Sequence, residues 1–205
     1  MIIGITGSFG TGKTTVANIF SKHGFKIINV DKLYHGIYTK DKSLKNKLKK
    51  EFGTLDRNKI KKIVFKDFNK LKKLNKLTHP LIKKEIKNEV STIIKKFNKK
   101  IINGKNSIEN KDHVKIIIDA PLLLEAKATN LIDKIIVVKC NKKEGIKRAL
   151  NKGKYSKTEI ENIIKSQMPL KEKIKYADFV VDNSGTIKET KEQIKEFLAK
   201  TLKTP

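Results

Sequence analysis

Near its start the 205-residue chain reads Gly7-Ser8-Phe9-Gly10-Thr11-Gly12-Lys13-Thr14, which has the spacing G-x-x-x-x-G-K-[ST]. That spacing predicts a phosphate-binding loop where a strand precedes it and a helix follows it. Residues 2–6 are a short apolar run typical of a buried strand, and residues 13–23 place Val16, Ile19 and Phe20 on one helical face. Both flanks fit, so we expect a phosphate-binding loop (P-loop) between the first strand and the first helix.

The residue types of this loop indicate a magnesium nucleotide as its ligand. Glycines let the backbone approach a polyphosphate, while the loop amides and the helix N-terminus supply fixed positive dipoles. Lys13 is expected to reach the β- and γ-phosphates and the Thr14 hydroxyl to bind Mg²⁺, which is favoured over a glycine-rich turn without a ligand. We therefore expect ATP and Mg²⁺ as cofactors, with ATP bound by Gly7, Ser8, Phe9, Gly10, Thr11, Gly12, Lys13, Thr14 and Thr15.

The rest of the chain alternates between strand-like and helix-like segments. Further strands are expected at residues 26–30, 115–118, 134–138 and 179–181, where β-branched residues run almost without interruption. Such runs are typical of parallel strands covered by helices on both faces. The sequence therefore predicts an α/β fold of three layers, with a parallel central sheet of about five strands.

Residues 43–100 contain no clear strand and predict a helical insertion after the second strand. Apolar residues recur there at helical spacing on both sides of Pro80, which we expect to begin a new helix. Residues 99–113 are polar and include Asn-Gly, so we expect a loop. Residues 141–167 alternate helical stretches with a turn at Gly153-Lys154-Tyr155-Ser156. All of these segments are expected to form one globular unit over residues 1–205.

The chain is strongly basic, with 48 Lys and Arg against 21 Asp and Glu and a formal net charge of +27. Only Arg57 and Arg148 are arginines, whereas a nucleic-acid reader would use more arginine for bidentate contacts, so a general lysine bias is favoured. No apolar run approaches the roughly 20 residues of a membrane helix. Cys140 is the only cysteine, which excludes an internal disulfide. We expect a cytoplasmic protein, a monomer or weak homo-oligomer, that binds a small-molecule substrate and neither nucleic acid nor membrane.

Two acidic residues follow predicted strands and are candidates for the chemistry. Asp31 comes after residues 25–30 and is a candidate general base or Mg²⁺ ligand; the alternative is an N-cap of the next helix. Asp119 comes after Ile116-Ile117-Ile118 and is a candidate Mg²⁺-linked carboxylate; the alternative is a strand-end cap. The D-x-x-G pattern expected of a GTPase is missing after Asp119, which favours a kinase.

Further motifs follow the P-loop in a fixed order. These are Asp31 with His35, Phe-Gly-x-Leu-Asp-Arg at 52–57, Leu-x-x-Leu-x-His-Pro-x-Ile at 74–82, Asp-x-Pro-Leu-Leu-x-Glu at 119–125, Ser-Gln-Met-Pro-Leu-Lys-Glu-Lys at 166–173, and Ala-Asp-Phe-Val-Val-Asp-Asn-Ser-Gly at 177–185. Together with the loop they resemble the dephospho-coenzyme A kinase family along nearly the whole chain. The resemblance implies transfer of a phosphoryl group from ATP to the ribose 3′-hydroxyl of dephospho-coenzyme A, the last step of coenzyme A synthesis.

The resemblance also implies an organisation and roles for single residues. Residues 1–40, 114–140 and 170–205 would form the nucleotide-binding core, 41–100 a helical lobe for the acceptor, and 141–169 a mobile lid. Asp31 would be the base, with Lys13 and the lid's Arg148 as further catalytic groups and Asn183 near the ATP base. Thr14 would bind Mg²⁺ together with Asp31 or Asp119. The acceptor-binding residues would be Asp31, His35, His79, Pro80 and Leu123.

The lid departs from the family pattern at two positions. Lys152 and Ile163 stand where many relatives have arginine, and lysine lacks the bidentate fork of arginine. Two alternatives remain from the residues themselves. A kinase for another nucleoside or nucleotide would keep Lys13, Thr14 and Asp31 without needing the His79-Pro80 motif, and a nucleic-acid-binding P-loop protein would use the positive charge.

Overall fold

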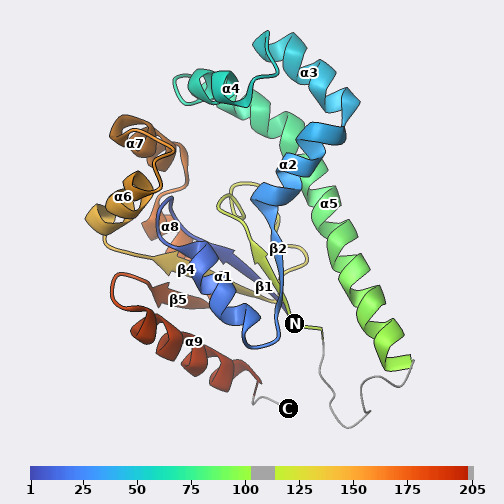
Figure 1. Cartoon of the computed structure of the whole chain (residues 1–205), viewed down its shortest axis with the longest axis vertical. Coiled ribbons are helices and arrows are strands. Elements are labelled where there is room, and N and C mark those ends of the chain that lie inside the picture. Colours follow the sequence, from blue (N-terminus) through green and yellow to red (C-terminus); the bar gives the residue numbers. More distant parts are fainter. Residues whose placement is uncertain (103–113, 203–205) are drawn as a thin grey trace.

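A computed structural model describes residues 1–102 and 114–202, with side chains placed for all of these except 100–102. Its centre is a sheet of five parallel strands in the order β2-β3-β1-β4-β5 (Figure 1). The strands are β1 (Ile2–Thr6), β2 (Lys26–Asn29), β3 (Ile116–Asp119), β4 (Lys134–Lys139) and β5 (Phe179–Asp182). The predicted parallel α/β sheet is therefore confirmed, with strand ends shifted by one residue; Val30 belongs to the next helix, not to β2.

The register of the sheet brings the carboxyl ends of three strands together. Ile5 of β1 pairs with Asp119 of β3, and Asn29 of β2 pairs with the same Asp119. On the other side of β1, Thr6 pairs with Val137 of β4. Residues after these strand ends therefore meet at one edge of the sheet, where the ligands of open α/β sheets bind.

Helices cover both faces of the sheet. On one face, α1 (Lys13–Ser21) and α9 (Ile187–Leu202) pack Val16, Phe20, Ile194 and Phe197 against apolar strand residues. On the other face, α5 (Phe68–Ile102) and residues 120–132 cover the sheet through contacts that include Ile86 and Leu123. This gives the expected three layers, because parallel strands must be buried on both sides.

A helical lobe stands above the sheet in Figure 1. It consists of α2 (Val30–Lys40), α3 (Lys42–Phe52), α4 (Arg57–Val64) and the first half of α5. The lobe has an apolar core of its own, in which Leu44, Leu48 and Ile60 are buried and leucines of α5 pack around them. Asp41 and Asp56 begin α3 and α4 as N-caps, so short polar side chains fix the turns between these helices.

Helix α5 corrects two predictions. Pro80 lies inside this 35-residue helix and does not begin a new one. Proline removes one backbone hydrogen bond, but α5 continues because its first half packs in the lobe core and its second half on the sheet. Residues 99–102 belong to α5 as well and are not part of a loop, while the rest of the predicted 99–113 loop, residues 103–113, lies outside the described residues.

The segment from 141 to 169, which we call the lid segment, contains α6 (Lys142–Asn151) and α7 (Lys157–Ser166) and leads into α8 (Leu170–Ile174). In Figure 1 its helices stand on the opposite side of the P-loop from the helical lobe. Ser156 and Glu159 form a capping box that begins α7. In the described part of the chain, no helix combines the length and the hydropathy of a membrane span.

Candidate active site

The P-loop connects β1 to α1, and its glycines are needed for close backbone approaches. Gly10 and Gly12 have φ angles of 83° and 87°, in the left-handed region that favours glycine. A Cβ at Gly10 would lie 2.3 Å from the Gly145 carbonyl oxygen of α6, and one at Gly12 would lie 2.1 Å from Asn183 Nδ2. The loop is therefore packed between the start of the lid segment and the residue after β5.

Lys13 begins α1 with its side chain folded over the loop. Its Nζ donates to the carbonyl oxygens of Gly7 at 3.2 Å and Ser8 at 2.8 Å, and the residue is 8% exposed. Burial lowers the pKa of Lys13 to about 8; the charge of Asp119 opposes that shift, and those of Asp31 and Lys152 act on it more weakly. The Lys13 ammonium thus lies among the carboxylates expected from the sequence.

Thr14 and Asp119 are in direct contact. Thr14 Oγ1 donates to Asp119 Oδ2 at 2.9 Å, and Asn29 Nδ2 donates to the same oxygen at 3.2 Å. Asp119 is the last residue of β3 and is buried; desolvation raises the pKa of its carboxyl group, although the hydrogen bond from Thr14 opposes this. Among the described residues, no group of three or more His, Cys, Asp or Glu side chains is arranged so that it could hold a metal ion. A hydroxyl and one carboxylate suit Mg²⁺, which takes oxygen ligands and usually keeps several waters.

Asp31 lies in the first turn of α2, across from this pair. The N-cap of α2 is Asn29, whose side chain accepts from the Lys32 amide, so the alternative that Asp31 caps the helix is wrong. Within the described residues the exposed Asp31 carboxylate has no hydrogen-bond partner, yet its charge reaches both Asp119 and Lys13. The structure therefore brings Asp31, Asp119, Thr14 and Lys13 within electrostatic reach of one another, and none of the described residues occupies the Asp31 carboxylate.

Asn183 holds the P-loop through a hydrogen bond, and Arg148 in turn holds Asn183. Asn183 is 3% exposed, donates from Nδ2 to Thr11 O at 2.9 Å and accepts from the Thr190 hydroxyl. Arg148 donates from Nη1 to Asn183 O at 2.7 Å and from Nε to Glu144. Both polar ends of the Asn183 side chain are held by the protein, so this side chain positions the P-loop, and its place near the ATP base stays a prediction. The Arg148 side chain is partly exposed, and its guanidinium is held against the residue that supports the loop.

Sequence reasoning missed a buried network at the end of the lid segment. Lys173 is fully buried and donates from Nζ to Pro121 O at 2.7 Å, and it forms an ion pair with Glu125 Oε1 at 2.8 Å. The same Glu125 oxygen accepts from the Met168 amide at 2.9 Å, while Gln167 Oε1 accepts from the Phe9 amide at 3.0 Å. The signal was present, since the 119–125 and 166–173 motifs contain these residues, but their pairing depends on the fold.

The predicted acceptor residues are spread over the helical lobe and the core. His35 on α2 accepts at Nδ1 from Arg57 Nη1, 2.7 Å away, and Arg57 lies over the ring of Tyr34. His79 on α5 is half-buried, which lowers the pKa of its imidazole, and Pro80 beside it is exposed. The prediction that Leu123 binds the acceptor is corrected, because Leu123 is 1% exposed and packs in the core against β1.

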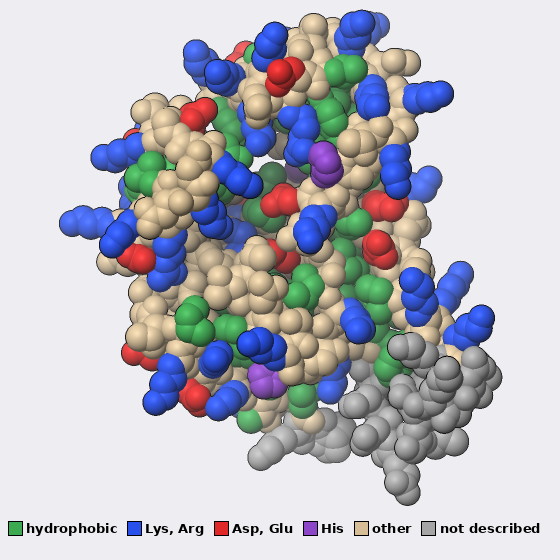
Figure 2. Space-filling view, in the orientation of Figure 1, with side chains coloured by type: hydrophobic (Ala, Val, Ile, Leu, Met, Phe, Trp, Pro, Cys, Tyr) green, Lys and Arg blue, Asp and Glu red, His purple; other side chains and the backbone are tan. Residues whose placement is uncertain are grey.

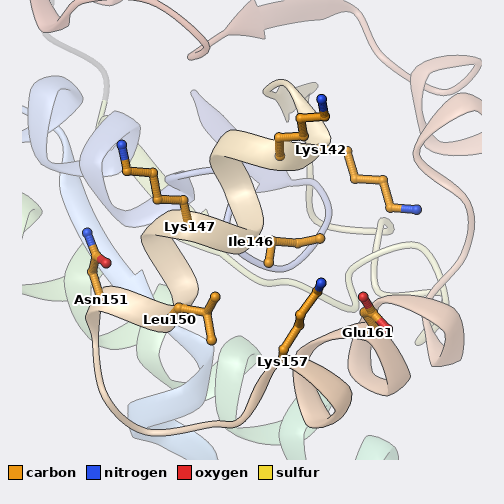
Figure 3. A pocket seen from close by; sticks show the side chains of 8 residues that line it. Lys142, Ile146, Lys147, Leu150, Asn151, Lys157 and Glu161 are labelled. Atoms are coloured by element: carbon orange, nitrogen blue, oxygen red, sulfur yellow. The ribbon is translucent and has the colours of Figure 1, made fainter.

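A hollow separates the lid segment from the helical lobe. Figure 2 shows it, with both acidic and basic side chains on its rim. A different groove, of about 480 Å³, lies between α6 and α7 (Figure 3). Lys142, Lys143, Lys147 and Lys157 surround it with Glu161 and Asn151, and Ile146 and Leu150 provide its apolar part. None of the P-loop residues, and neither Asp31 nor Asp119, lines this groove.

Comparisons with known proteins agree with this geometry. A family model described as dephospho-CoA kinase matches residues 1–189. A dephospho-CoA kinase of Carboxydothermus hydrogenoformans is 39% identical, with 97% of this chain and 93% of that protein aligned. One from Aquifex aeolicus is 36% identical over 99% of this chain and 98% of its own length. The solved dephospho-CoA kinase from Campylobacter jejuni superposes with a TM-score of 0.62 at 25% identity, covering 97% of this chain and 96% of its own.

These matches favour the dephospho-CoA kinase family over the two alternatives, which were another small-molecule kinase and a nucleic-acid-binding P-loop protein. The chain belongs to the dephospho-CoA kinase family and uses ATP to phosphorylate dephospho-CoA in coenzyme A synthesis.

Proposed function

We propose that the phosphoryl group passes to the ribose 3′-hydroxyl of dephospho-CoA in the hollow between the P-loop and the helical lobe, with Asp31 as the general base. The observation that carries this proposal is the Asp31 carboxylate, which has no hydrogen-bond partner among the described residues and whose charge acts on Asp119, the partner of Thr14. A carboxylate without a protein partner is available to accept a proton from a bound hydroxyl. Its neighbours Lys13 and Thr14 are the residues expected to hold the donor nucleotide.

The donor side would be organised by the backbone of residues 7–14 and by Lys13. Loop amides and the N-terminus of α1 are fixed donors for phosphate oxygens. With a pKa of about 8, Lys13 is charged at neutral pH and can leave its two loop carbonyls for the β- and γ-phosphates. Arg148 and Lys152, from the lid segment, would add positive charge on the opposite side of the transferred group.

Mg²⁺ fits the oxygen atoms of Thr14 and Asp119, with Asp31 as an alternative ligand. When bound, the ion would supply positive charge that offsets the negative charge of the nucleotide phosphates. The Asn29 amide holds Asp119 Oδ2 in place, and burial of this carboxylate makes a nearby cation favourable. Thr14 and Asp119 would therefore orient the metal nucleotide without taking part in proton transfer.

In the proposed reaction, the oxygen of the 3′-hydroxyl forms a bond to the γ-phosphorus, and Asp31 accepts the proton of that hydroxyl. The bond between that phosphorus and the bridging oxygen of ATP breaks, and ADP leaves with the electron pair. The acceptor would lie against the helical lobe, near His35 with its partner Arg57 and near His79. Residues 1–40, 114–140 and 170–205 would be the nucleotide-binding core, residues 41–100 the acceptor lobe and residues 141–169 the lid.

The test is a turnover assay with ATP, Mg²⁺ and dephospho-CoA, beside adenosine, AMP and uridine as acceptors, followed by ³¹P NMR of the product. We expect turnover with dephospho-CoA and a phosphomonoester on its 3′-oxygen, and none after chelation of divalent cations by EDTA. A phosphate on another oxygen, or equal turnover of AMP, would refute the proposed acceptor position. Asp119→Asn should weaken metal-nucleotide binding, which Mn²⁺ EPR can measure directly.

A further inference from the structure

Three parts of the molecule that are distant in sequence meet at one side chain, Tyr155. Tyr155 lies in the turn between α6 and α7 of the lid segment. Its ring meets the ring of Phe9, at the tip of the P-loop, edge to face, with centroids 5.5 Å apart and an interplanar angle of 89°. From the other side, Lys61 Nζ on α4 of the helical lobe donates to the Tyr155 hydroxyl at 3.0 Å and lies 5.2 Å from the ring centroid.

The contact between Lys61 and Tyr155 differs from the general lysine surface of this chain. Lys61 is only partly exposed, and its ammonium donates a charge-assisted hydrogen bond to the hydroxyl at the edge of the Tyr155 ring. Glu159 on α7 lies close enough for the charges of Lys62 and Lys61 to help lower the pKa of its carboxyl group, after the dominant hydrogen bonds from Ser156. The Glu159 carboxylate therefore lies within reach of the positive charges of α4.

The lid segment holds the tip of the P-loop at two points. Besides the ring contact with Tyr155, the Phe9 amide donates to Gln167 Oε1 at 3.0 Å. Phe9 belongs to the loop whose amides are expected to surround the nucleotide phosphates. A shift of Tyr155 would therefore move the ring of Phe9, and a shift of Lys61 would change what holds Tyr155.

We propose that Tyr155 is a positioning residue that couples the acceptor site on the helical lobe to the nucleotide site, through Lys61 on one side and Phe9 on the other. The proposal rests on the assignment of the helical lobe to the acceptor. Binding of dephospho-CoA to the lobe fixes α4, Lys61 then holds Tyr155, and Tyr155 fixes the P-loop tip in the conformation that binds ATP. The coupling is reciprocal, so ATP tightens acceptor binding by the same factor.

The test is calorimetric titration with AMP-PNP, a non-hydrolysable ATP analogue, with and without saturating dephospho-CoA. In the unaltered protein we expect the acceptor to tighten AMP-PNP binding by a factor of about 5–150, the usual range of coupling between two sites. Lys61→Met should bring this factor close to one, while AMP-PNP affinity without the acceptor changes by less than about twofold. Tyr155→Phe keeps the ring contacts and loses only the hydroxyl, so it should lower the factor part of the way.

Lys66→Met is the matched control, because Lys66 is exposed in the same lobe and its amine has no partner among the described residues. It should keep the full coupling factor. The double variant Lys61→Met with Tyr155→Phe should lose no more coupling than Lys61→Met alone, since both changes remove one contact. Full coupling in Lys61→Met, or no coupling in the unaltered protein, would overturn the inference. Failure of dephospho-CoA to bind or to be phosphorylated would instead refute the proposed function.

Discussion

The two sides of the hollow are built differently. On the nucleotide side, the functional atoms are held by the ends of neighbouring strands and by buried hydrogen bonds, as in Thr14 to Asp119 and Asn183 to Thr11. On the proposed acceptor side, the helical lobe has a core of its own and meets the lid segment through side chains such as Lys61 and Tyr155. The nucleotide side is thus fixed by the sheet, whereas the helical lobe meets the lid segment through contacts between partly exposed side chains, which we call the docked contacts.

This difference suggests that the region that carries the chemistry, the sheet edge, is separate from the helices that can move. A sheet edge gives carboxylates fixed positions without reorganisation, which suits charge stabilisation in the transition state. Docked helices can open for substrate entry and close to exclude water. Variants on the nucleotide side should therefore affect catalysis or folding strongly, whereas variants at the docked contacts should change coupling and rates in smaller steps.

The largest effect is expected for Asp31→Asn, which removes the proposed base and keeps the size of the side chain. Loss of general base catalysis should lower kcat by about 10²–10⁴-fold. The affinity for AMP-PNP should stay close to that of the unaltered protein, because Asp31 has no hydrogen bond to the P-loop among the described residues. Steady-state kinetics and calorimetry measure the two quantities. Lys32→Gln, an exposed neighbour in the same turn, is the control, and an unchanged kcat in Asp31→Asn would exclude the base role.

The next largest effect concerns the buried pair that ties the end of the lid segment to the core. Glu125→Gln leaves the fully buried Lys173 ammonium without its anionic partner, which should lower the free energy of unfolding by about 3 kcal/mol. Urea denaturation measures this change. Glu172→Gln removes an exposed partner of Lys175 and should cost less than about 1 kcal/mol. Equal losses in the two variants would mean that the buried pair does not anchor the lid segment.

The nucleotide side could largely be predicted from the sequence because its signals are contiguous. The P-loop spacing, the apolar runs of the strands and the carboxylate after Ile116-Ile117-Ile118 all report local structure. Asp31 could be singled out for the same reason, because it directly follows an apolar run of strand length. Its alternative as an N-cap failed because Asn29, two residues earlier, has the position and the side chain for that role.

The acceptor side was predicted less completely, because its contacts depend on packing between distant segments. Pro80 was expected to begin a new helix, but packing at both ends of α5 overrides the local preference of proline. Leu123 lies within a matched motif, and only the fold shows that it serves the core. No spacing rule indicates that Tyr155 meets both Phe9 and Lys61.

An intermediate effect is expected from pH, through Lys13. Its pKa is about 8, so above that pH the free protein loses the charge that the phosphates require, and AMP-PNP binding must take up a proton. Affinity should therefore fall as pH rises, approaching about tenfold per unit above pH 8. Stability has the opposite sign: the unfolded lysine keeps its proton up to about its usual pKa, so this group's contribution to stability rises with pH between these values.

Calorimetry at pH 7 to 9.5 in two buffers of different ionisation enthalpy measures the affinity and the proton uptake together. We expect uptake to approach one proton at the alkaline end. A flat affinity profile without proton uptake would show that Lys13 does not carry the titrating charge. That outcome would remove the main electrostatic difference between the two sides.

The smallest effect is expected from Lys152→Arg on the lid segment. Lys152 is exposed just after α6, and its charge is felt at Lys13, so it lies within electrostatic reach of the transferred group. Arginine can bind phosphate oxygens with two parallel hydrogen bonds where lysine offers a point charge, so kcat/KM should rise by about threefold to tenfold. Lys154→Arg, in the adjoining turn, should change kcat/KM by less. Because Lys152 is exposed, the free energy of unfolding should stay the same. A gain in kcat/KM without a change in stability would show that the lid segment can be tuned independently of the sheet.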